Sequence, residues 1–279
     1  GRVLRLRGGG RDDRAPAPLV LASINIDTLT DAKYVSLVQC MKDHKPPIQA
    51  CAVQDHKLKS WRHLEDGPAG SEYVPILNEC GEGPSGGLAG GVGWIVRRDC
   101  LHRFEEMPCQ GEGPQLKTLC VDKVARLVSL YVQPNEGHEA NTKQVMGWLQ
   151  QAAEAGKSAI WMGDMNCNML PASDAPLKHV WEEFCLEHNC ERVDAQAGWG
   201  AVPTRQPRGA ERDRVSPSHI DMVVATEAAT ALLKPKLVAV GSGTTLDSTG
   251  DGDTDHKLLV VECEVRHSVR KRTVRKKKW

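Results

Sequence analysis

Ten short apolar runs constrain the fold of this 279-residue chain more than any other feature of its sequence. Each run is five to eight residues long and is flanked by polar or Gly/Pro-containing segments, which is typical of buried strands. The predicted strands are Leu19–Ile26, Ala50–Gln54, Tyr73–Leu77, Val92–Val96, Thr118–Asp122, Ala125–Val132, Ala159–Gly163, Ile220–Ala225, Lys236–Val240 and Leu258–Val265.

Three longer segments are better suited to helices: Asp31–Lys42, Glu139–Ala155 and Ala175–Asn189, the last with Asp174 as its N-cap. Many strands mixed with few helices predict an α/β protein in which two packed sheets are covered by helices. The chain is long enough, and at 40% hydrophobic residues apolar enough, for one large core, so we expect a single domain over residues 19–265.

Two segments are predicted loops. Gly81–Gly93 holds seven glycines, but it lacks the GxxxxGK[ST] pattern of a phosphate-binding loop and is followed by a strand. Gly198–Pro217 is rich in Arg, Pro and Gly, and its Trp199 is a candidate for substrate contact. Five other tryptophans are expected to pack helices and strands: Trp61, Trp94, Trp148, Trp161 and Trp181. Four histidines form no metal-ligand spacing and are expected at the surface: His56, His63, His138 and His179. His219 lies within a strand motif and is a candidate for lining the cleft.

The charge is divided unevenly along the chain. Residues 266–279 form a basic tail with eight Lys or Arg and no acid. The rest of the chain therefore contains 28 basic residues and all 36 acidic residues. Residues 1–265 therefore have a net charge of about −8. A tail of this kind can attract phosphates, and a solvated end or a linker to a further domain accounts for it equally well.

Residues 1–18 are rich in Arg, Gly and Pro and are predicted to be a linker. Within them Val3–Gly9, with the sequence VLRLRGG, resembles the C-terminal tail of ubiquitin, which implies a precursor cut after Gly9. An ordinary Arg/Gly linker also produces such a string, and both interpretations stay open. The absence of an initiator Met suggests a piece of a longer chain.

The ten cysteines lie at irregular spacings with no CxxC pair, and the chain has no Asn-x-Ser/Thr acceptor. Buried thiols in a reducing compartment are therefore favoured over disulfides or a zinc site. No apolar run approaches the roughly 18 residues of a membrane helix. We expect an intracellular protein of the nucleus or cytoplasm, without a membrane partner.

Polar residues at the ends of the predicted strands are the candidates for chemistry, because a sheet can present them together at one rim. They are Asn25, Asp27, Gln54, Asp55, Tyr131, Asn135, Asp164, Asn166, Asp221, Asp255 and His256. A single residue of this kind is usually part of a turn. Six such sites that together supply oxygen ligands and one imidazole indicate a functional rim.

Hydrolysis of a phosphodiester needs a cation, an oriented water and a donor to the phosphate. Asp27 and Asp55 suit Mg²⁺, or alternatively Mn²⁺, because these ions prefer oxygen ligands. Asp164 with the nearby Asn166 suits the positioning of a water. His256 could donate to the phosphate. Asp221 could set the tautomer and charge of that imidazole.

The order of these residues resembles the endonuclease/exonuclease/phosphatase family over residues 19–265. The motifs are Asn25-Ile26-Asp27, Gln54-Asp55-His56-Lys57, Gly90-Gly91-Val92-Gly93, Tyr131-Val132-Gln133-Pro134-Asn135, Gly163-Asp164-Met165-Asn166, Ser218-His219-Ile220-Asp221 and Thr254-Asp255-His256. They look most like the exonuclease III and apurinic-endonuclease branch, which includes endonuclease domains of non-LTR retrotransposons. The resemblance implies a four-layered α/β sandwich with two mixed β-sheets flanked by helices.

The resemblance also implies a metal site. Asp55 stands where the family usually has a metal-binding Glu, and Asp27 and Asp255 lie near the same ion. Asp is one methylene shorter than Glu, so the ion must sit deeper or the strand must shift. Loss of the Glu could equally mark an inactive copy, although the other positions match.

The remaining implied roles concern water, phosphate and the transition state. Asn25 orients its neighbours, Asp164 and Asn166 position or activate the water, and the Asp221–His256 pair stabilises the transition state. Tyr131 and Asn135 contact the phosphate region. Thr204 falls where the family often has a Thr ahead of the motif that ends in Asp221, and it is a further candidate for substrate binding.

The sequence thus predicts a Mg²⁺-dependent phosphodiester hydrolase whose partner is nucleic acid, with DNA as the first candidate. An upstream ubiquitin unit and a downstream reverse transcriptase are expected as further parts of a precursor. The same fold acting on lipid or RNA, and an inactive binding module, are the alternatives. A lipid enzyme would be expected to carry an apolar membrane-facing loop, whereas Gly198–Pro217 is basic.

Overall fold

The computed structural model describes residues 18–83, 86–107, 113–134, 138–154, 157–173, 175–207, 214–241 and 254–264. The ubiquitin-like segment 3–9, the basic tail 266–279 and the candidate residue Asn135 lie outside the described residues. The first described strand begins at Leu19 and the last ends at Cys263.

Two six-stranded mixed sheets form the centre of the fold. The first has the order β13-β14-β1-β2-β6-β3, with β1 and β2 parallel and its other neighbouring strands antiparallel. Its strands are β1 (Leu19–Asn25), β2 (Ala50–Gln54), β3 (Tyr73–Leu77), β6 (Val92–Arg97), β13 (Lys236–Val240) and β14 (Leu259–Cys263).

The second sheet has the order β11-β12-β10-β9-β8-β7, with β9 and β10 parallel. Its strands are β7 (Phe104–Glu106), β8 (Leu116–Val121), β9 (Ala125–Tyr131), β10 (Ala159–Asp164), β11 (Cys190–Arg192) and β12 (Asp221–Thr226). Each sheet therefore contains one parallel pair at its centre, and the two sheets repeat the same local arrangement.

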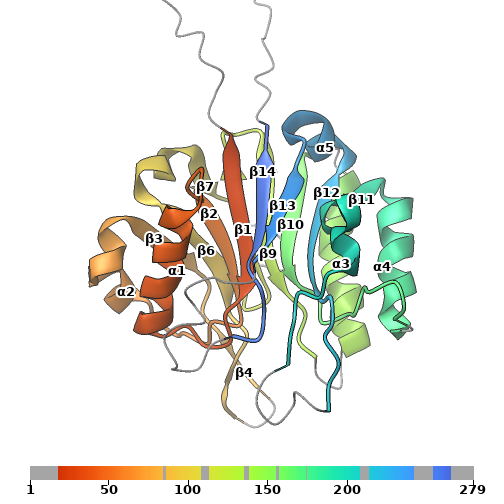
Figure 1. Cartoon of the computed structure of the whole chain (residues 1–279), viewed down its shortest axis with the longest axis horizontal. Coiled ribbons are helices and arrows are strands. Elements are labelled where there is room, and N and C mark those ends of the chain that lie inside the picture. Colours follow the sequence, from red (N-terminus) through yellow and green to blue (C-terminus); the bar gives the residue numbers. More distant parts are fainter. Residues whose placement is uncertain are drawn as a thin grey trace, which may run out of the picture.

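Helices cover the outer face of each sheet (Figure 1). Helices α1 (Asp31–Asp43) and α2 (Arg62–Asp66) lie beside the first sheet, and α3 (His138–Glu154) and α4 (Pro176–Glu187) lie beside the second. The remaining helical segments of the described residues are the short α5 (Glu227–Leu233) and the 3₁₀ segments η1 (Pro68–Ser71), η2 (Arg98–Arg103) and η3 (Val193–Ala201). The predicted four-layered α/β sandwich is confirmed.

Three apolar clusters explain why the strand sequences are continuous apolar runs. One lies between the sheets and includes Trp94 and Met162, a second joins the first sheet to α1, and a third joins the second sheet to α4 through Trp181. All seven residues of β1 are buried because both faces of the strand are covered. Among the described residues, no helix is both long enough and apolar enough to cross a membrane.

The predicted strands and helices occur within a few residues of their expected bounds, and the differences lie in short elements. The structure adds α2, α5, β7 and β11, which are too short to show a clear periodicity. The predicted glycine loop contains a small hairpin of β4 (Gly81–Glu82) and β5 (Leu88–Ala89). Ala175, rather than the predicted Asp174, is the N-cap of α4, and Asp174 lies outside the described residues.

Strand register brings the polar strand ends together. Asn25 ends β1 opposite Gln54 of β2, and Asp164 ends β10 opposite both Tyr131 of β9 and Asp221 of β12. The two rims belong to facing sheets, so residues far apart in the sequence meet at one edge of the sandwich.

Candidate active site

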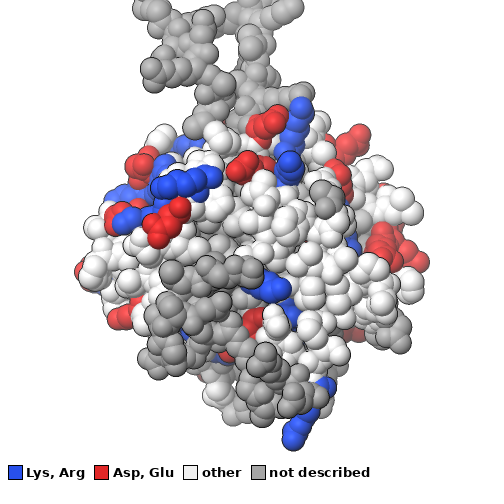
Figure 2. All heavy atoms as spheres, viewed as in Figure 1, with Lys and Arg blue, Asp and Glu red and all other residues white. Residues whose placement is uncertain are grey.

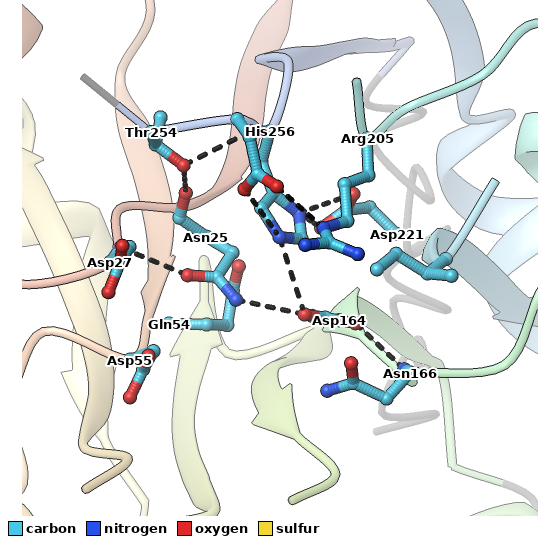
Figure 3. A network of polar contacts seen from close by, with 12 residues as sticks. Asn25, Asp27, Gln54, Asp55, Asp164, Asn166, Arg205, Asp221, Thr254 and His256 are labelled. Atoms are coloured by element: carbon cyan, nitrogen blue, oxygen red, sulfur yellow. Dashed lines mark hydrogen bonds and ion pairs between the residues drawn. The ribbon is translucent and has the colours of Figure 1, made fainter. Parts of the chain in front are cut away.

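A pocket of about 510 Å³ opens at this edge of the sandwich. Its lining residues are Asn25, Asp27, Asp55, Tyr131, Pro134, Asp164, Asn166, Arg205, Asp255 and His256. Eight of the eleven candidate site residues are among them. Figure 3 shows how most of these side chains converge from both sheets.

Asp164 is held between the two sheets by hydrogen bonds to both of its oxygens. The side-chain amide of Asn25 donates to Oδ2 over 2.8 Å, and the backbone N–H of Asn166 donates to Oδ1 over 2.7 Å. The carboxylate is almost completely buried, and burial raises its pKa, although the nearby His256 charge opposes that shift. A fixed carboxylate with a raised pKa is a stronger base than an exposed Asp.

Asp221 and His256 form a buried pair. The Nδ1 atom of His256 lies 2.9 Å from Oδ2 and 3.0 Å from Oδ1 of Asp221. Since a carboxylate only accepts, Nδ1 carries a proton. Burial alone would lower the pKa of His256, but the carboxylates of Asp221, Asp164 and Asp255 together outweigh burial and raise this pKa to about 9. The imidazole is therefore charged at neutral pH, and its Nε2–H faces the pocket.

The other nitrogen of His256 is also surrounded by carboxylates. Nε2 lies 3.8 Å from Oδ2 of Asp164 and 3.5 Å from Oδ1 of Asp255. These distances are too long for good hydrogen bonds, so Nε2–H keeps its donor capacity for a third group.

The predicted metal ligands Asp27 and Asp55 face a protein cation instead. The ammonium of Lys57 lies 2.6 Å from Oδ1 of Asp27 and 3.2 Å from Oδ2 of Asp55. Burial acts to raise the pKa of Asp27, but Lys57 more than offsets it and the pKa is lowered. At Asp55 burial outweighs the same lysine, and the pKa is raised. The lysine has a raised pKa and keeps its charge.

The third predicted metal ligand, Asp255, is paired in the same way. Its Oδ2 accepts a hydrogen bond from Nε of Arg205 over 2.6 Å. Sequence reasoning gave no role to Arg205 or Lys57. A signal existed for both, because Lys57 ends the Gln54–Lys57 motif and Arg205 directly follows Thr204.

Two acidic sets at the pocket differ in their suitability for a metal ion. Within the described ranges, the acidic and imidazole residues whose ligand atoms all lie within 4.8 Å of one another are Asp164, Asp221 and His256. In that set the imidazole is protonated and already bonded to Asp221, so it offers no free nitrogen as a metal ligand. Asp27, Asp55 and Asp255 line the same pocket and supply carboxylate oxygens of the type that Mg²⁺ prefers, although their ligand atoms do not all lie within 4.8 Å of one another, so the fit is one of donor chemistry.

Thr204 lies behind the pocket rather than in its lining. It is fully buried, and its hydroxyl accepts hydrogen bonds from the backbone N–H groups of Ile220 and Asp221, at 3.1 and 3.0 Å. The hydroxyl therefore holds the backbone at Asp221, and the substrate-binding role of Thr204 stays a prediction. Tyr131 is largely buried at the pocket wall, where burial raises the pKa of its phenol.

The expected positions of His56 and His219 are wrong, and Trp199, which remains a candidate for substrate contact, is partly buried. His56 is fully buried, its Nδ1 accepts from the Leu58 N–H, and burial lowers its pKa to about 4, so the ring is neutral. Trp199 packs against the core between the sheets. His219, a candidate for lining the cleft, is fully buried and contacts the carboxylate of Asp194 over 3.0 Å.

Comparison with solved structures supports the same architecture. The 3′ phosphatase NExo from Neisseria, bound to a product DNA hairpin, has a TM-score of 0.63 at 15% identity, covering 88% of this chain and 99% of that chain. AP endonuclease LMAP from Leishmania major has 0.66 at 14% identity, covering 95% and 93%. An endonuclease/exonuclease/phosphatase from Bacteroides vulgatus has 0.56 at 13% identity, covering 89% and 99%.

Comparison by sequence finds no relative: no protein-family model matches the chain, and no significant match is found among curated proteins. Identities of 13–15% show a common fold. The two facing mixed sheets, their helical layers and these structural neighbours agree, so the chain has the fold of the endonuclease/exonuclease/phosphatase proteins.

Proposed function

We propose that this chain is a divalent-metal-dependent phosphodiester hydrolase that acts on nucleic acid, with DNA as substrate and Mg²⁺ as the metal, for which Mn²⁺ can substitute. The observation that carries the proposal is the convergence of a fixed carboxylate and a charged imidazole in one pocket. Oδ2 of Asp164 and Nε2 of His256 lie 3.8 Å apart, which is too far for a hydrogen bond between them and close enough for both to contact one oxygen atom placed in the pocket.

Asp164 is the residue that would hold and deprotonate the attacking water. Each of its oxygens uses one acceptor site for Asn25 or Asn166, which leaves further acceptor sites for a water O–H. Asn166 is itself fixed by a 2.8 Å hydrogen bond from its side chain to the Val132 carbonyl. The water would therefore meet a base that does not need to reorient during the reaction.

His256 would stabilise the negative charge that develops on the phosphate. Asp221 holds the imidazole charged and oriented, and Thr204 holds the backbone of Asp221 in turn. The Nε2–H can donate to a nonbridging oxygen or to the leaving oxygen. Tyr131 and Arg205, which also line the pocket, are suited to contact the phosphate, and Asn135 retains the same proposed role.

Asp27, Asp55 and Asp255 are the residues that would hold the metal. When bound, a divalent cation neutralises phosphate charge and lowers the pKa of a coordinated water. Asn25 helps to order this side of the pocket, because its Oδ1 accepts from the Asp27 N–H over 3.0 Å while its amide holds Asp164.

A nucleic-acid substrate is favoured by the neighbours and by the chain's basic tail. The Neisseria structure contains a DNA hairpin, and two structural neighbours are described as AP endonucleases. Basic and acidic side chains are interspersed on the face drawn in Figure 2, so the described surface there has no single dominant charge. We infer that residues 266–279 supply the long-range attraction to phosphates.

We infer further that the chain is an endonuclease of the apurinic or retrotransposon type, cut from a precursor. The motif order supports this inference, as do the ubiquitin-like Val3–Gly9 and the basic tail. Nine of the cysteines are described and all nine are free, which favours the nucleus or cytoplasm. Sequencing the transcript on both sides tests the inference: a ubiquitin unit upstream or a reverse transcriptase downstream supports it, and an unrelated context on both sides contradicts it.

Nicking of supercoiled plasmid by the full chain tests the function. Cleavage is expected with Mg²⁺ and is expected to stop with chelator. Asp164→Asn should reduce the single-turnover rate by about 10²-fold or more. The matched control is Asp31→Asn, which removes the same charge from a side chain that is 77% exposed.

The same preparations should be assayed on an abasic duplex, on RNA and on phosphoinositide vesicles. Cleavage of RNA or lipid alone would replace DNA as the substrate while leaving the chemistry intact. No turnover on any substrate, from folded protein with Mg²⁺ or Mn²⁺, would contradict the proposed function and favour a binding module.

A further inference from the structure

We propose that Lys57 is a cation beside the pocket, whose ammonium competes with a divalent metal for Asp27 and Asp55. The Nζ atom lies 2.6 Å from one carboxylate and 3.2 Å from the other, between the two side chains that the metal would use. Its side chain is 27% exposed, so the flexible stem can also turn outward.

The position of Lys57 is built by the backbone around it. Asp27, Asp55 and Lys57 all have positive φ, at 41°, 52° and 56°, a conformation that is uncommon outside glycine. The Gly90 N–H donates to Oδ1 of Asp55 over 2.9 Å, which leaves Oδ2 directed at the ammonium. Each end of the bridge is therefore held by local structure, and the contact is not an incidental surface pair.

Asp27 is held on the opposite side of the ammonium. Its N–H donates to Asn25 Oδ1, and its carbonyl oxygen accepts from the buried Lys33 ammonium over 2.7 Å. These contacts fix the backbone of Asp27 beside Lys57, while its side chain is 58% exposed. A metal that binds both carboxylates must therefore meet the ammonium first.

The Lys57 ammonium and a metal would compete because both are cations and because the Asp55 side chain is short. An ammonium and a divalent ion bound to the same oxygens repel each other strongly at a separation of a few ångströms. A Glu at this position would be one methylene longer, and could carry its carboxylate past Lys57. The shorter Asp55 keeps its Oδ2 at the ammonium, so binding of a metal to both carboxylates requires Lys57 to turn outward.

This inference rests on the proposed function only in placing the metal at Asp27 and Asp55. Its test is therefore direct binding of Mn²⁺ to the full chain, measured by electron paramagnetic resonance and by calorimetry without substrate. Lys57→Met removes the charge and keeps the length of the side chain. We expect it to tighten Mn²⁺ binding by about tenfold or more relative to the wild type.

Two control variants separate charge from other effects. Lys57→Arg keeps a cation at the position and should bind Mn²⁺ as weakly as the wild type. Lys59→Met removes a charge two residues away, from an exposed lysine outside the pocket lining, and should change the affinity by less than about twofold. An equal gain in Lys59→Met would indicate a general charge effect and overturn the proposal.

Asp55→Glu provides an independent arm that leaves Lys57 in place. It should also tighten Mn²⁺ binding, because the longer side chain can reach past the ammonium. A thermal-shift series gives a second readout: Lys57→Met should melt lower than the wild type in chelator and gain more melting temperature on adding Mn²⁺.

Unchanged or weaker Mn²⁺ binding in both Lys57→Met and Asp55→Glu overturns the proposal, and so does a failure of all variants to bind Mn²⁺ at millimolar concentration. The result is separable from the proposed function. Tight Mn²⁺ binding by Lys57→Met without any phosphodiester cleavage supports the competing lysine and contradicts the enzyme. If the protein cleaves DNA with Mg²⁺ and Lys57→Met leaves the Mn²⁺ affinity unchanged, the enzyme is supported and the competing lysine is contradicted.

Discussion

The Nδ1 atom of His256 lies 2.9 Å from Oδ2 of Asp221, although 35 residues separate the two in the sequence. Both side chains are buried, so neither has water as an alternative partner for this contact. The pair therefore acts as one unit, in which the carboxylate supplies the orientation and charge of the imidazole.

We expect His256→Ala and Asp221→Asn each to lower the single-turnover rate by about 10²-fold or more, with little loss of substrate binding. The double variant should be barely slower than either single variant, because residues that act as a unit are not additive. His179→Ala, at a side chain that is 82% exposed on α4, is the histidine control. Multiplicative losses would argue against a coupled pair, and near-normal rates would remove His256 from the mechanism.

The charge of His256 should persist well above neutral pH in metal-free protein. Because its pKa in the folded state is about 9 and that of an unfolded histidine is about 6.5, the pair's contribution to stability is fully present below pH 6.5 and is lost as the pH rises through about 9. A nuclear magnetic resonance titration in chelator measures the midpoint. Asp221→Asn should move it downward, and an unchanged midpoint would show that Asp221 does not hold the charge.

Asp55 should be needed for metal-dependent cleavage. Asp55→Ala is expected to lower Mg²⁺-dependent nicking by about tenfold or more, since it removes a carboxylate ligand. Asp55→Glu should preserve or raise the rate, because the extra methylene lets the carboxylate reach the metal. Glu82→Ala removes an exposed acid from the nearby hairpin and serves as the control. Undiminished cleavage by Asp55→Ala would exclude this residue as a ligand.

The basic tail should contribute attraction and not chemistry. Deleting residues 266–279 should weaken DNA binding and flatten its dependence on salt, because each lost phosphate contact reduces the slope by about 0.9. The rate on saturating DNA should survive. Binding titrations at several salt concentrations provide the measurement, and an unchanged slope would show that the tail is only a linker.

Gly91 should be intolerant of a side chain for a reason that Gly86 does not share. Both have positive φ, at 90° and 78°, but a Cβ on Gly91 would lie 2.6 Å from Cε1 of the buried His56 ring, whereas a Cβ on Gly86 meets nothing within 4 Å. Denaturant unfolding should show a loss of about 2–4 kcal/mol for Gly91→Ala and about 1 kcal/mol for Gly86→Ala. Equal losses would mean that the His56 ring moves aside freely.

The sequence by itself determined the main strands and helices, because apolar periodicity is a local property of the chain. Leu19–Ile26 was predicted as a buried strand from its own residues, and β1 spans Leu19–Asn25. Short elements such as α2 and β11 carry too few residues for a period to be visible, and their formation depends on the sheets and helices that they pack against.

The sequence also placed the candidate chemistry at strand ends, and the resemblance in motif order supplied the candidate roles. Eight of those candidates line one pocket. Only the tertiary structure decided which of them touch. Asn25 holds Asp164 across 139 residues of sequence, because the two sheets face each other at that edge.

The tertiary structure also decided the charge balance of the pocket. His56 was predicted to be a surface residue and is buried, since Gly91 lies directly against its ring. Lys57, the next residue, turns its ammonium between Asp27 and Asp55. Burial and charge pairing depend on which distant segments enclose a side chain, so they cannot be predicted from residue type or from spacing along the chain.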